Sequence, residues 1–357
     1  LHGSAKTYRK TSKGSDHWLA TELVLPLLLL IPMAYAMDVS LVTMAWAHQI
    51  LCNLHPELMK ANGGARTIAK TAKLYRLWAR TRRKHMSDWE RTLVKPFDKC
   101  GKGSSALHAA ADRSIMSEIA VRNGLKVCGS LFDLHKFFDT VEPMPLLDSL
   151  NDTKFPPIDA VMGYQMHVAP RVLLVSTIAS KMIRVDLTIL PGCIYAIPFV
   201  KSLMHEGSTL VYAKNPNYNT YVDDVSNVAI GYGPDVQEAI VEAAILFKNK
   251  LVVKRKFQLS PKSAVVASDL KLAKSVAAEL AQHNITVVVA TSSRDLGIMF
   301  TAGMSRDLSL IKSRIAKSAK RTQRIARVAK VNRSARKLFV AGALPQGIWG
   351  HQAVGVS

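Results

Sequence analysis

Acidic residues and closely spaced cysteines are both scarce in this sequence. Its 357 residues include 26 Asp and Glu against 48 Lys and Arg, so the formal net charge is +22. Such an excess of positive charge indicates a polyanionic partner, either nucleic acid or an anionic membrane surface. The four cysteines stand far apart with no Cys-x-x-Cys pair. This spacing argues against a disulfide framework or a zinc site and favours a reducing compartment.

No apolar run reaches the ~20 residues that a membrane-spanning helix requires. The run at residues 23–37 follows a basic segment and contains Pro26 and Pro32, and its composition imitates a secretory signal. We nevertheless expect it to be a buried segment of an intracellular protein, nuclear or cytoplasmic. Residues 1–22 are expected to form a loose basic segment. Because the sequence starts with leucine rather than methionine, we also expect a fragment of a longer protein.

Two adjacent carboxylates, Asp223 and Asp224, lie between the short β-prone runs 220–222 and 225–230. The pattern predicts a β-hairpin with the acidic pair at its tip. Because successive side chains of a strand point to opposite faces, only a turn lets two consecutive Asp residues converge. A divalent cation would relieve their repulsion, and Mg²⁺ prefers carboxylate oxygens. An ordinary Asp-rich turn is the competing interpretation.

A further carboxylate, Asp133, follows the apolar run 127–132, which predicts a buried strand. Two carboxylate-bearing strands lying side by side could hold two metal ions roughly 3.5–4 Å apart. The two stretches together resemble the catalytic palm of reverse transcriptases. Asp133 falls on the first conserved Asp of that family, and Tyr221-Val222-Asp223-Asp224 falls on its Tyr-x-Asp-Asp box.

The resemblance implies roles for these residues. Asp133, Asp223 and Asp224 would be the catalytic residues and the ligands of Mg²⁺, with Mn²⁺ as a possible substitute. Tyr221 would lie at the dNTP. Phe138 falls where the family places the aromatic side chain that blocks a ribose 2′-hydroxyl.

Residues 60–84 contain nine Lys and Arg and no acidic residue. A solvated charged face is one interpretation. The segment also resembles the fingers hairpin Lys-x-x-Gly-Gly-x-Arg-Pro-Ile of non-LTR retroelement reverse transcriptases. The resemblance implies that Lys60 and Arg66 bind the triphosphate of the incoming nucleotide, whose transfer spreads negative charge over phosphoryl oxygens. Thr67 departs from the family, which has Pro there.

Three later segments fit the same family in the same order. Gly192 is expected to start a helix and resembles the nucleotide-positioning loop, although Pro191 replaces the usual Gln. Lys262 stands where the family has a lysine near the leaving pyrophosphate, as general acid or charge stabiliser; an exposed lysine at a strand entrance is the alternative. Residues 294–298 match the Leu-Gly-Val turn that grips the primer end.

Residues 306–337 contain twelve Lys and Arg and one acidic residue. Their weak apolar face predicts one long helix, or two broken near Asn332. The resemblance implies a thumb along the duplex backbone, where phosphate contacts carry affinity but little sequence information. An interfacial membrane helix is the alternative, but the large apolar residues that would anchor it are lacking. The cations assigned to nucleic acid are Lys312, Lys320, Arg324 and Arg327.

The resemblance thus implies an α+β protein with a right-hand polymerase architecture. Residues 23–126 would form the fingers, residues 127–300 a palm of antiparallel sheet plus helices with finger insertions, and residues 301–357 a truncated helical thumb. The implied enzyme is an RNA-directed DNA polymerase of a retrotransposon. This nucleotidyltransferase would add dNTPs to a DNA primer 3′-hydroxyl on an RNA template by two-metal phosphoryl transfer.

Two other functions are compatible with the sequence. The first is a non-catalytic nucleic-acid-binding remnant of such a polymerase, since Thr67 and Pro191 depart from the family. The second is a basic membrane-associated protein led by residues 23–37. We expect neither a membrane partner nor an obligate protein partner.

Overall fold

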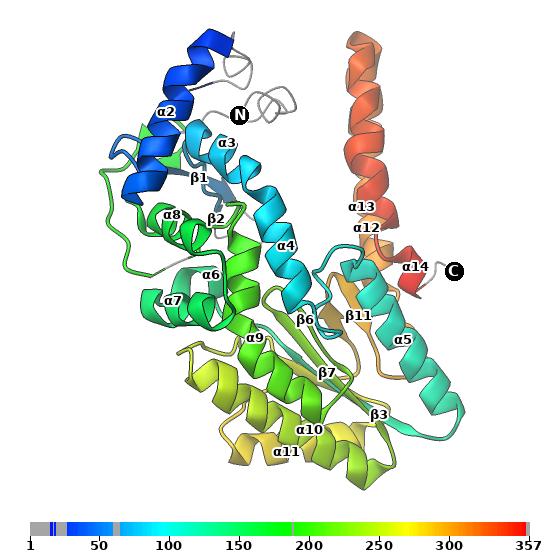
Figure 1. Ribbon diagram of the computed structural model, residues 1–357. Coiled ribbons are helices and arrows are strands. Elements are labelled where there is room, and N and C mark those ends of the chain that lie inside the picture. The colour runs from blue at the N-terminus through cyan, green and yellow to red at the C-terminus, as the bar shows by residue number, and fades with distance from the viewer. Residues whose placement is uncertain (1–14, 17, 19–26, 60–64, 188, 355–357) are drawn as a thin grey trace. The chain divides into compact units, whose positions relative to one another are not determined.

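The computed structural model describes residues 15, 16, 18, 27–59, 65–187 and 189–354 (Figure 1). The chain forms two compact units and crosses between them five times. The ranges predicted for fingers, palm and thumb do not coincide with these units, and those subdomain boundaries stay a prediction. Unit 1 comprises Leu1–Val94, Lys136–Glu206 and Lys254–Phe257, and unit 2 comprises Lys95–His135, Gly207–Val253 and Gln258–Ser357.

Unit 2 is built on a five-stranded sheet with the strand order β6-β7-β3-β8-β9. Neighbouring strands are antiparallel, except that β8 and β9 are parallel. The central strand β3 is buried at every residue after its first, which confirms the buried strand predicted before Asp133. The strands are β3 (Lys126–Phe132), β6 (Tyr218–Tyr221), β7 (Asp224–Gly231), β8 (Ala264–Ala267) and β9 (Val288–Ala290).

Helices cover this sheet on both faces. Helices α10 and α11 pack on one face, and α5 packs on the other (Figure 1). Helix α5 begins directly after its N-cap Ser105, which accepts a hydrogen bond from the backbone N–H of His108 at 3.1 Å. The α-helices are α5 (Ala106–Arg122), α10 (Gly233–Phe247), α11 (Leu270–Gln282), α12 (Ser309–Val331), α13 (Leu344–Ile348) and α14 (His351–Val354). The shorter helical turns are η1 (Lys248–Val253), η2 (Arg333–Arg336) and η3 (Phe339–Ala343).

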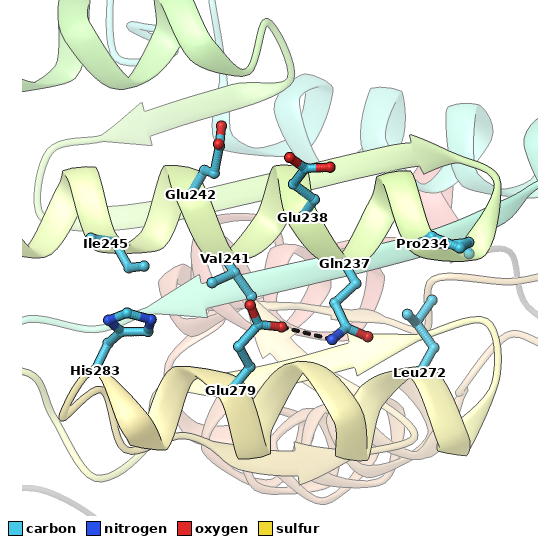
Figure 2. A pocket seen from close by; sticks show the side chains of 10 residues that line it. Pro234, Gln237, Glu238, Val241, Glu242, Ile245, Leu272, Glu279 and His283 are labelled. Atoms are coloured by element: carbon cyan, nitrogen blue, oxygen red, sulfur yellow. Dashed lines mark hydrogen bonds between the residues drawn. The ribbon is translucent and has the colours of Figure 1, made fainter.

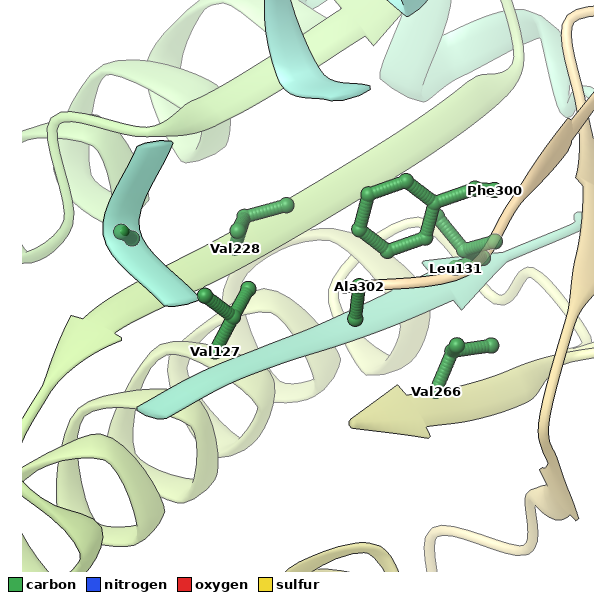
Figure 3. Packing of buried hydrophobic residues seen from close by; sticks show 7 residues of the cluster. Val127, Leu131, Val228, Val266, Phe300 and Ala302 are labelled. Carbon is green, nitrogen blue, oxygen red and sulfur yellow. The ribbon is translucent and has the colours of Figure 1, made fainter. Parts of the chain in front are cut away.

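The alternation of side chains along β3 assigns its residues to these two faces. Phe132 stacks on Phe247 of α10 with ring centroids 5.0 Å apart. Val127 and Leu131 point to the opposite face, where they form a buried cluster (Figure 3). The other buried members of this cluster are Ala120, Val228, Val266, Phe300 and Ala302. The face that holds α5 is therefore the one that continues toward Asp133.

A small hairpin of β10 (Ser293–Asp295) and β11 (Ile298–Phe300) supplies Phe300 to that cluster. Its turn consists of Leu296 and Gly297, both with positive φ angles of 48° and 78°, as a type I′ turn requires. Gly129 of β3 makes room for the hairpin, because an added Cβ there would lie 2.7 Å from Phe300 Cε1. The hairpin is therefore packed directly on the centre of the sheet.

Unit 1 contains a second sheet, with the order β2-β1-β4-β5. Strand β1 is parallel to β4 and antiparallel to β2. Ser176, with φ 56°, starts a two-residue turn that separates β4 from β5. The strands are β1 (Asn53–Met59), β2 (Ala65–Thr67), β4 (Arg171–Val175) and β5 (Ile178–Ala179).

The helices of unit 1 enclose a buried polar centre. The carboxylate of Asp159 is fully buried and accepts hydrogen bonds from Arg82 at 2.9 and 3.0 Å and from the Tyr195 hydroxyl at 2.7 Å. The helices are α2 (Leu27–Thr43), α3 (Lys73–Thr81), α4 (Arg83–Leu93), α6 (Phe137–Thr140), α7 (Pro143–Asp152), α8 (Pro157–Val168) and the first part of α9 (Ala196–Lys214), whose last residues belong to unit 2.

The expectation of a buried segment at residues 23–37 is wrong for the part that the structure describes. These residues contribute to α2, in which Ile31 and Tyr35 are 58% and 71% exposed and only Met37 of residues 31–37 is buried. Within the described ranges, no helix combines the length and the apolar character needed to cross a membrane.

Candidate catalytic carboxylate site

Hairpin β6–β7 carries the acidic pair. Tyr221 pairs with Asp224 across the two strands, so Val222 and Asp223 form a two-residue turn. Val222 has a φ of 61°, the sign that the first central residue of a type II′ turn requires. A β-branched residue in this region is strained, and such strain is concentrated at functional sites. The predicted hairpin with the acidic pair at its tip is confirmed.

Asp133 lies beside this hairpin because of the register of β3 and β7. The antiparallel ladder ends with the pair Phe132 and Val225, so Asp133 and Asp224 are the next residues on the two strands. Beyond the ladder, the backbone N–H of Asp133 donates to Ser263 Oγ at 3.3 Å, and its carbonyl accepts from the N–H of Ser260 at 2.7 Å. The carboxylates that the sequence separates by about ninety residues thus reach one end of the sheet.

The surroundings of Asp224 at this end of the sheet raise its pKa. It is raised from 3.8 to about 7, first because surrounding protein disfavours the charge and then because Asp223, Asp295 and Asp133 repel it. Because the side chain of Asp224 still reaches solvent, repulsion between the carboxylates matters more here than burial. A positive charge bound near Asp224 would therefore be strongly favourable.

One cation already lies in this region. Arg113 of α5 forms an ion pair with Asp295, the last residue of β10, and the two side chains are only 5% and 8% exposed. Both line a small recess together with Tyr221 and Asp224. The positive charge of Arg113 lowers the pKa of Asp224 and so opposes the three carboxylates in part.

The donor set suits a hard divalent cation by its chemistry, because carboxylate oxygens are the ligands that Mg²⁺ prefers. Asp133, Asp223 and Asp224 also lie at one end of the sheet, where the charges of Asp223 and Asp133 raise the pKa of Asp224. Among the described residues, however, no three His, Cys, Asp or Glu side chains stand close enough to share one ion. The side chains of the cluster would have to turn toward one another to share a metal.

Lys262 lies in the turn Pro261–Lys262 before β8, where its side chain is exposed. Its backbone N–H donates to Ser260 Oγ at 3.3 Å, and Ser260 and Ser263 are the residues bonded to the backbone of Asp133. The turn that carries Lys262 therefore borders the carboxylate site. Its role at a leaving pyrophosphate stays a prediction.

The remaining nucleotide-binding candidates belong to unit 1. Lys60 lies outside the described residues, and of Arg66 the structure describes the backbone, which is part of β2. Gly192 does not start a helix, which corrects our expectation: it occupies a turn with φ 97°, and α9 begins at Ala196. Phe138 lies in α6, edge-on to the ring of Phe137 at 5.6 Å.

Within unit 1 the Gly192 turn contacts residues 68 and 69, which directly follow β2, the strand that carries Arg66. The N–H of Ala69 donates to the carbonyl of Pro191 at 3.1 Å, and a Cβ added to Gly192 would lie 3.3 Å from Cγ2 of Ile68. A glycine suits this position because of both its φ and the close approach. Two segments that the sequence assigned to the nucleotide are therefore neighbours.

Helix α12 of unit 2 carries the cations assigned to nucleic acid. It contains eight Lys and Arg and no acidic residue, and it ends at Val331 with Asn332 as its C-cap, as predicted. Lys312, Lys320, Arg324 and Arg327 are exposed. Helical geometry places these four residues within about one third of the circumference, while the buried residues Ile311 and Ile325 occupy the other side.

A hollow of about 610 Å³ lies between α10 and α11 (Figure 2). Glu238, Glu242 and Glu279 line it, and Gln237 donates to Glu279 at 2.7 Å. It contains none of the predicted site residues. Because its carboxylates would repel phosphates, this helical face is not suited to nucleic acid.

Sequence reasoning missed Arg113, Lys99 and the part played by Asp295. Asp295 was part of the segment matched to the primer-gripping turn, but its charge was given no role. Arg113 stands on the buried face of α5, where a charged residue in a row of small ones was a usable signal. Lys99 lines the same recess as Asp224 because its segment runs beside β6, with the N–H of Lys99 donating to the carbonyl of Thr220 at 2.9 Å.

No protein-family model and no curated protein matches this sequence. Among solved structures, the chain is similar to apo telomerase from Candida tropicalis, truncated from the C-terminal domain, with a TM-score of 0.50 and 12% sequence identity. The match covers 72% of this chain and 55% of that chain, so the chain spans about half the length of this neighbour. At this identity the likeness concerns the fold alone. The chain has a mixed α+β fold that is similar to part of this telomerase structure.

Proposed function

We propose that the chain is an RNA-directed DNA polymerase of a retroelement, acting inside the cell, which extends a DNA primer on an RNA template. One observation carries the proposal: Asp133 and Asp224 are the next residues on their strands beyond the last β3–β7 pair, and Asp223 lies in the adjoining turn. The fold, which is similar to that of telomerase, and the basic helix α12 support it.

In this proposal Asp133, Asp223 and Asp224 bind Mg²⁺, or Mn²⁺ in its place. The metal would lower the pKa of the primer 3′-hydroxyl and balance the charge of the triphosphate. Asp224 has to be ionised to take part, and a bound cation would lower its raised pKa. Binding of the cation would be favoured because it relieves the repulsion between the carboxylates.

Other residues would bind and orient the substrates. Lys60 and Arg66 hold the triphosphate, and Gly192 lets the backbone approach the nucleotide. Tyr221 and Phe138 contact the nucleotide, with Phe138 excluding a ribose 2′-hydroxyl. Lys262 stabilises the charge of the leaving pyrophosphate. The exposed cations of α12 hold the phosphates of the template–primer duplex.

The test is primer extension on poly(rA)/oligo(dT) with Mg²⁺. We expect extension by the wild type, and a loss of at least about a hundredfold in Asp223→Asn and in Asp224→Asn, because each removes a metal ligand but keeps its shape. Asp235→Asn, at the exposed start of α10, is the matched control and should retain full extension. Equal extension by all four proteins would refute the assignment of these carboxylates.

A non-catalytic nucleic-acid-binding protein is the second candidate. The absence of a preformed three-ligand metal group among the described residues favours it, and the cations of α12 would serve it equally well. The same experiment separates the two candidates: tight, salt-dependent duplex binding with no extension by any form would identify the second.

A further inference from the structure

Arg113 and Asp295 form an ion pair in the recess that Asp224 also lines. Arg113 lines the recess that contains Asp224, yet its guanidinium binds Asp295 instead. A guanidinium beside two carboxylates can pair with either. If Arg113 paired with Asp224, it would occupy the oxygens on which a metal ion depends.

Several contacts fix Asp295 in place. It is the last residue of β10 and pairs with Ile298 across the tight turn of Leu296 and Gly297. The hairpin is packed on the sheet through Phe300, which is buried against Gly129 and Leu131. Asp295 therefore belongs to a rigid element whose position does not depend on the ion pair alone.

Arg113 is equally restrained. It is on the buried face of α5, where its carbonyl accepts a hydrogen bond from Ser117 Oγ at 2.8 Å. Its Nε is buried and has no hydrogen-bond partner, so the guanidinium is only partly satisfied by Asp295. An unsatisfied buried donor favours any further carboxylate within reach.

We propose that Asp295 is a positioning residue that binds Arg113 and thereby keeps Asp224 available for a divalent cation. This inference rests on the proposed function, because it assigns a task at the same carboxylates. Arg113 in turn allows Asp295 to be buried in its charged form, since an unpaired buried carboxylate would be costly. The pair adds no net charge to a cluster that already contains three carboxylates.

The effect of changing Asp295 on metal binding should depend on the presence of Arg113. A purely structural ion pair would show no such dependence. In Asp295→Asn the partner of Arg113 loses its charge, so Arg113 turns to Asp224 and competes with the metal. In the double variant Arg113→Met/Asp295→Asn the competing cation is gone, and Asp224 is free again. Lys99, which also lines the recess, is unchanged in all of these proteins.

The experiment measures Mn²⁺ binding to the full chain by the loss of the free-ion EPR signal, with no nucleotide present. We expect Asp295→Asn to raise the Mn²⁺ dissociation constant about tenfold, the scale on which a neighbouring cation shifts a carboxylate equilibrium. The double variant should return to within about twofold of the wild type, which is close to the precision of such comparisons. Melting temperatures measured alongside show whether each variant is folded.

The control is Glu118→Gln. Glu118 is on the same helix, α5, as Arg113, and its carboxylate accepts hydrogen bonds from Arg306 at 2.7 and 2.8 Å. This substitution should leave Mn²⁺ binding unchanged. Mn²⁺ affinity in Asp295→Asn equal to the wild type, or no recovery in a folded double variant, would overturn the positioning role while the proposed function stands. A wild type that binds no Mn²⁺ at Asp223 and Asp224 would overturn both.

Discussion

Gly129 of β3 and Phe300 of β11 approach so closely that a Cβ on the glycine would lie 2.7 Å from the aromatic ring. Phe300 sits over the centre of the sheet in the cluster of Figure 3. The contact joins the hairpin that holds Asp295 to the strand that leads to Asp133. We therefore expect Gly129 to be important for both stability and the geometry of the site.

Gly129→Ala should destabilise the protein by about 1–3 kcal/mol, because an added methyl group in a filled core forces its neighbours to move. Urea unfolding followed by circular dichroism measures this. Gly233→Ala is the matched control: no atom lies within 4 Å of its added Cβ, and it begins α10, so its stability should be equal to or above that of the wild type. A Gly129→Ala protein as stable as the wild type would show that Phe300 moves aside freely.

The raised pKa of Asp224 predicts a pH-dependent stability. Its pKa in the folded protein, about 7, exceeds the ordinary 3.8, so the folded state binds this proton more tightly than the unfolded state does. Its contribution to stability is complete below pH ~4 and is lost as the pH rises through about 7. In EDTA, Asp224→Asn should therefore melt above the wild type at about pH 8, and this gain should shrink toward pH ~4.

Mg²⁺ offers an independent check on that pH dependence. Added metal should raise the melting temperature of the wild type at high pH and leave Asp224→Asn less affected, because stabilisation follows differential binding to the folded state. A gain for Asp224→Asn that is constant over the whole pH range would contradict the electrostatic interpretation of this cluster.

Two buried histidines of unit 1 predict acid sensitivity. Burial and the charge of Arg171 lower the pKa of His167 to about 3 and that of His55 to about 4. Both are neutral in the folded protein, so the stability they contribute is present above pH ~6.5 and is lost as the pH falls toward about 4 and below. Since one pKa unit corresponds to about 1.4 kcal/mol, the loss should be on the order of a few kcal/mol.

His167→Asn tests this prediction. Nδ1 of His167 accepts the backbone N–H of Leu190 at 3.4 Å, and an asparagine oxygen can replace that acceptor without titrating. The variant should be less stable near neutral pH but should lose less stability between pH ~6.5 and ~4. His283→Asn, at the exposed end of α11, should keep the wild-type pH profile.

The basic side of α12 predicts the salt dependence of duplex binding. Each phosphate contact that is removed should reduce the slope of log K against log salt by about 0.9. Ala substitutions at Lys320, Arg324 and Arg327 should therefore weaken binding similarly for all sequences and flatten the slope. Lys271→Ala/Lys274→Ala, on the exposed side of α11, is the control and should change neither quantity.

Local patterns predicted much of unit 2 from the sequence alone. The Asp pair between two β-prone runs predicted hairpin β6–β7, and the apolar run before Asp133 predicted β3. Ser105 is a typical N-cap residue, and α5 begins at the next residue, Ala106. These predictions succeed because each signal lies within a few residues of the feature that it specifies.

Features that depend on distant partners were not predictable in this way. Arg113 and Asp295 are 182 residues apart in sequence, and only the packing of β11 on β3 brings them together. Strand β1 contains Pro56, which argues against a strand between two neighbours, yet it pairs with both β2 and β4. Helix α7 begins at Pro143, a residue that suits the first turn of a helix but is also common in turns.

The segments of the two units alternate along the chain, so neither unit can be synthesised or cut out as one piece. Since neither unit is a continuous segment, a ribosome has to synthesise unit 1 up to Phe257 before all of its pieces exist, by which time much of unit 2 has already been made. Unit 1 can therefore not finish folding before much of unit 2 has been synthesised, and unit 2 is completed only by the segment Gln258–Ser357. For the same reason a single cut anywhere between Val94 and Gln258 divides at least one unit, so neither unit can be expressed or exchanged as a simple module.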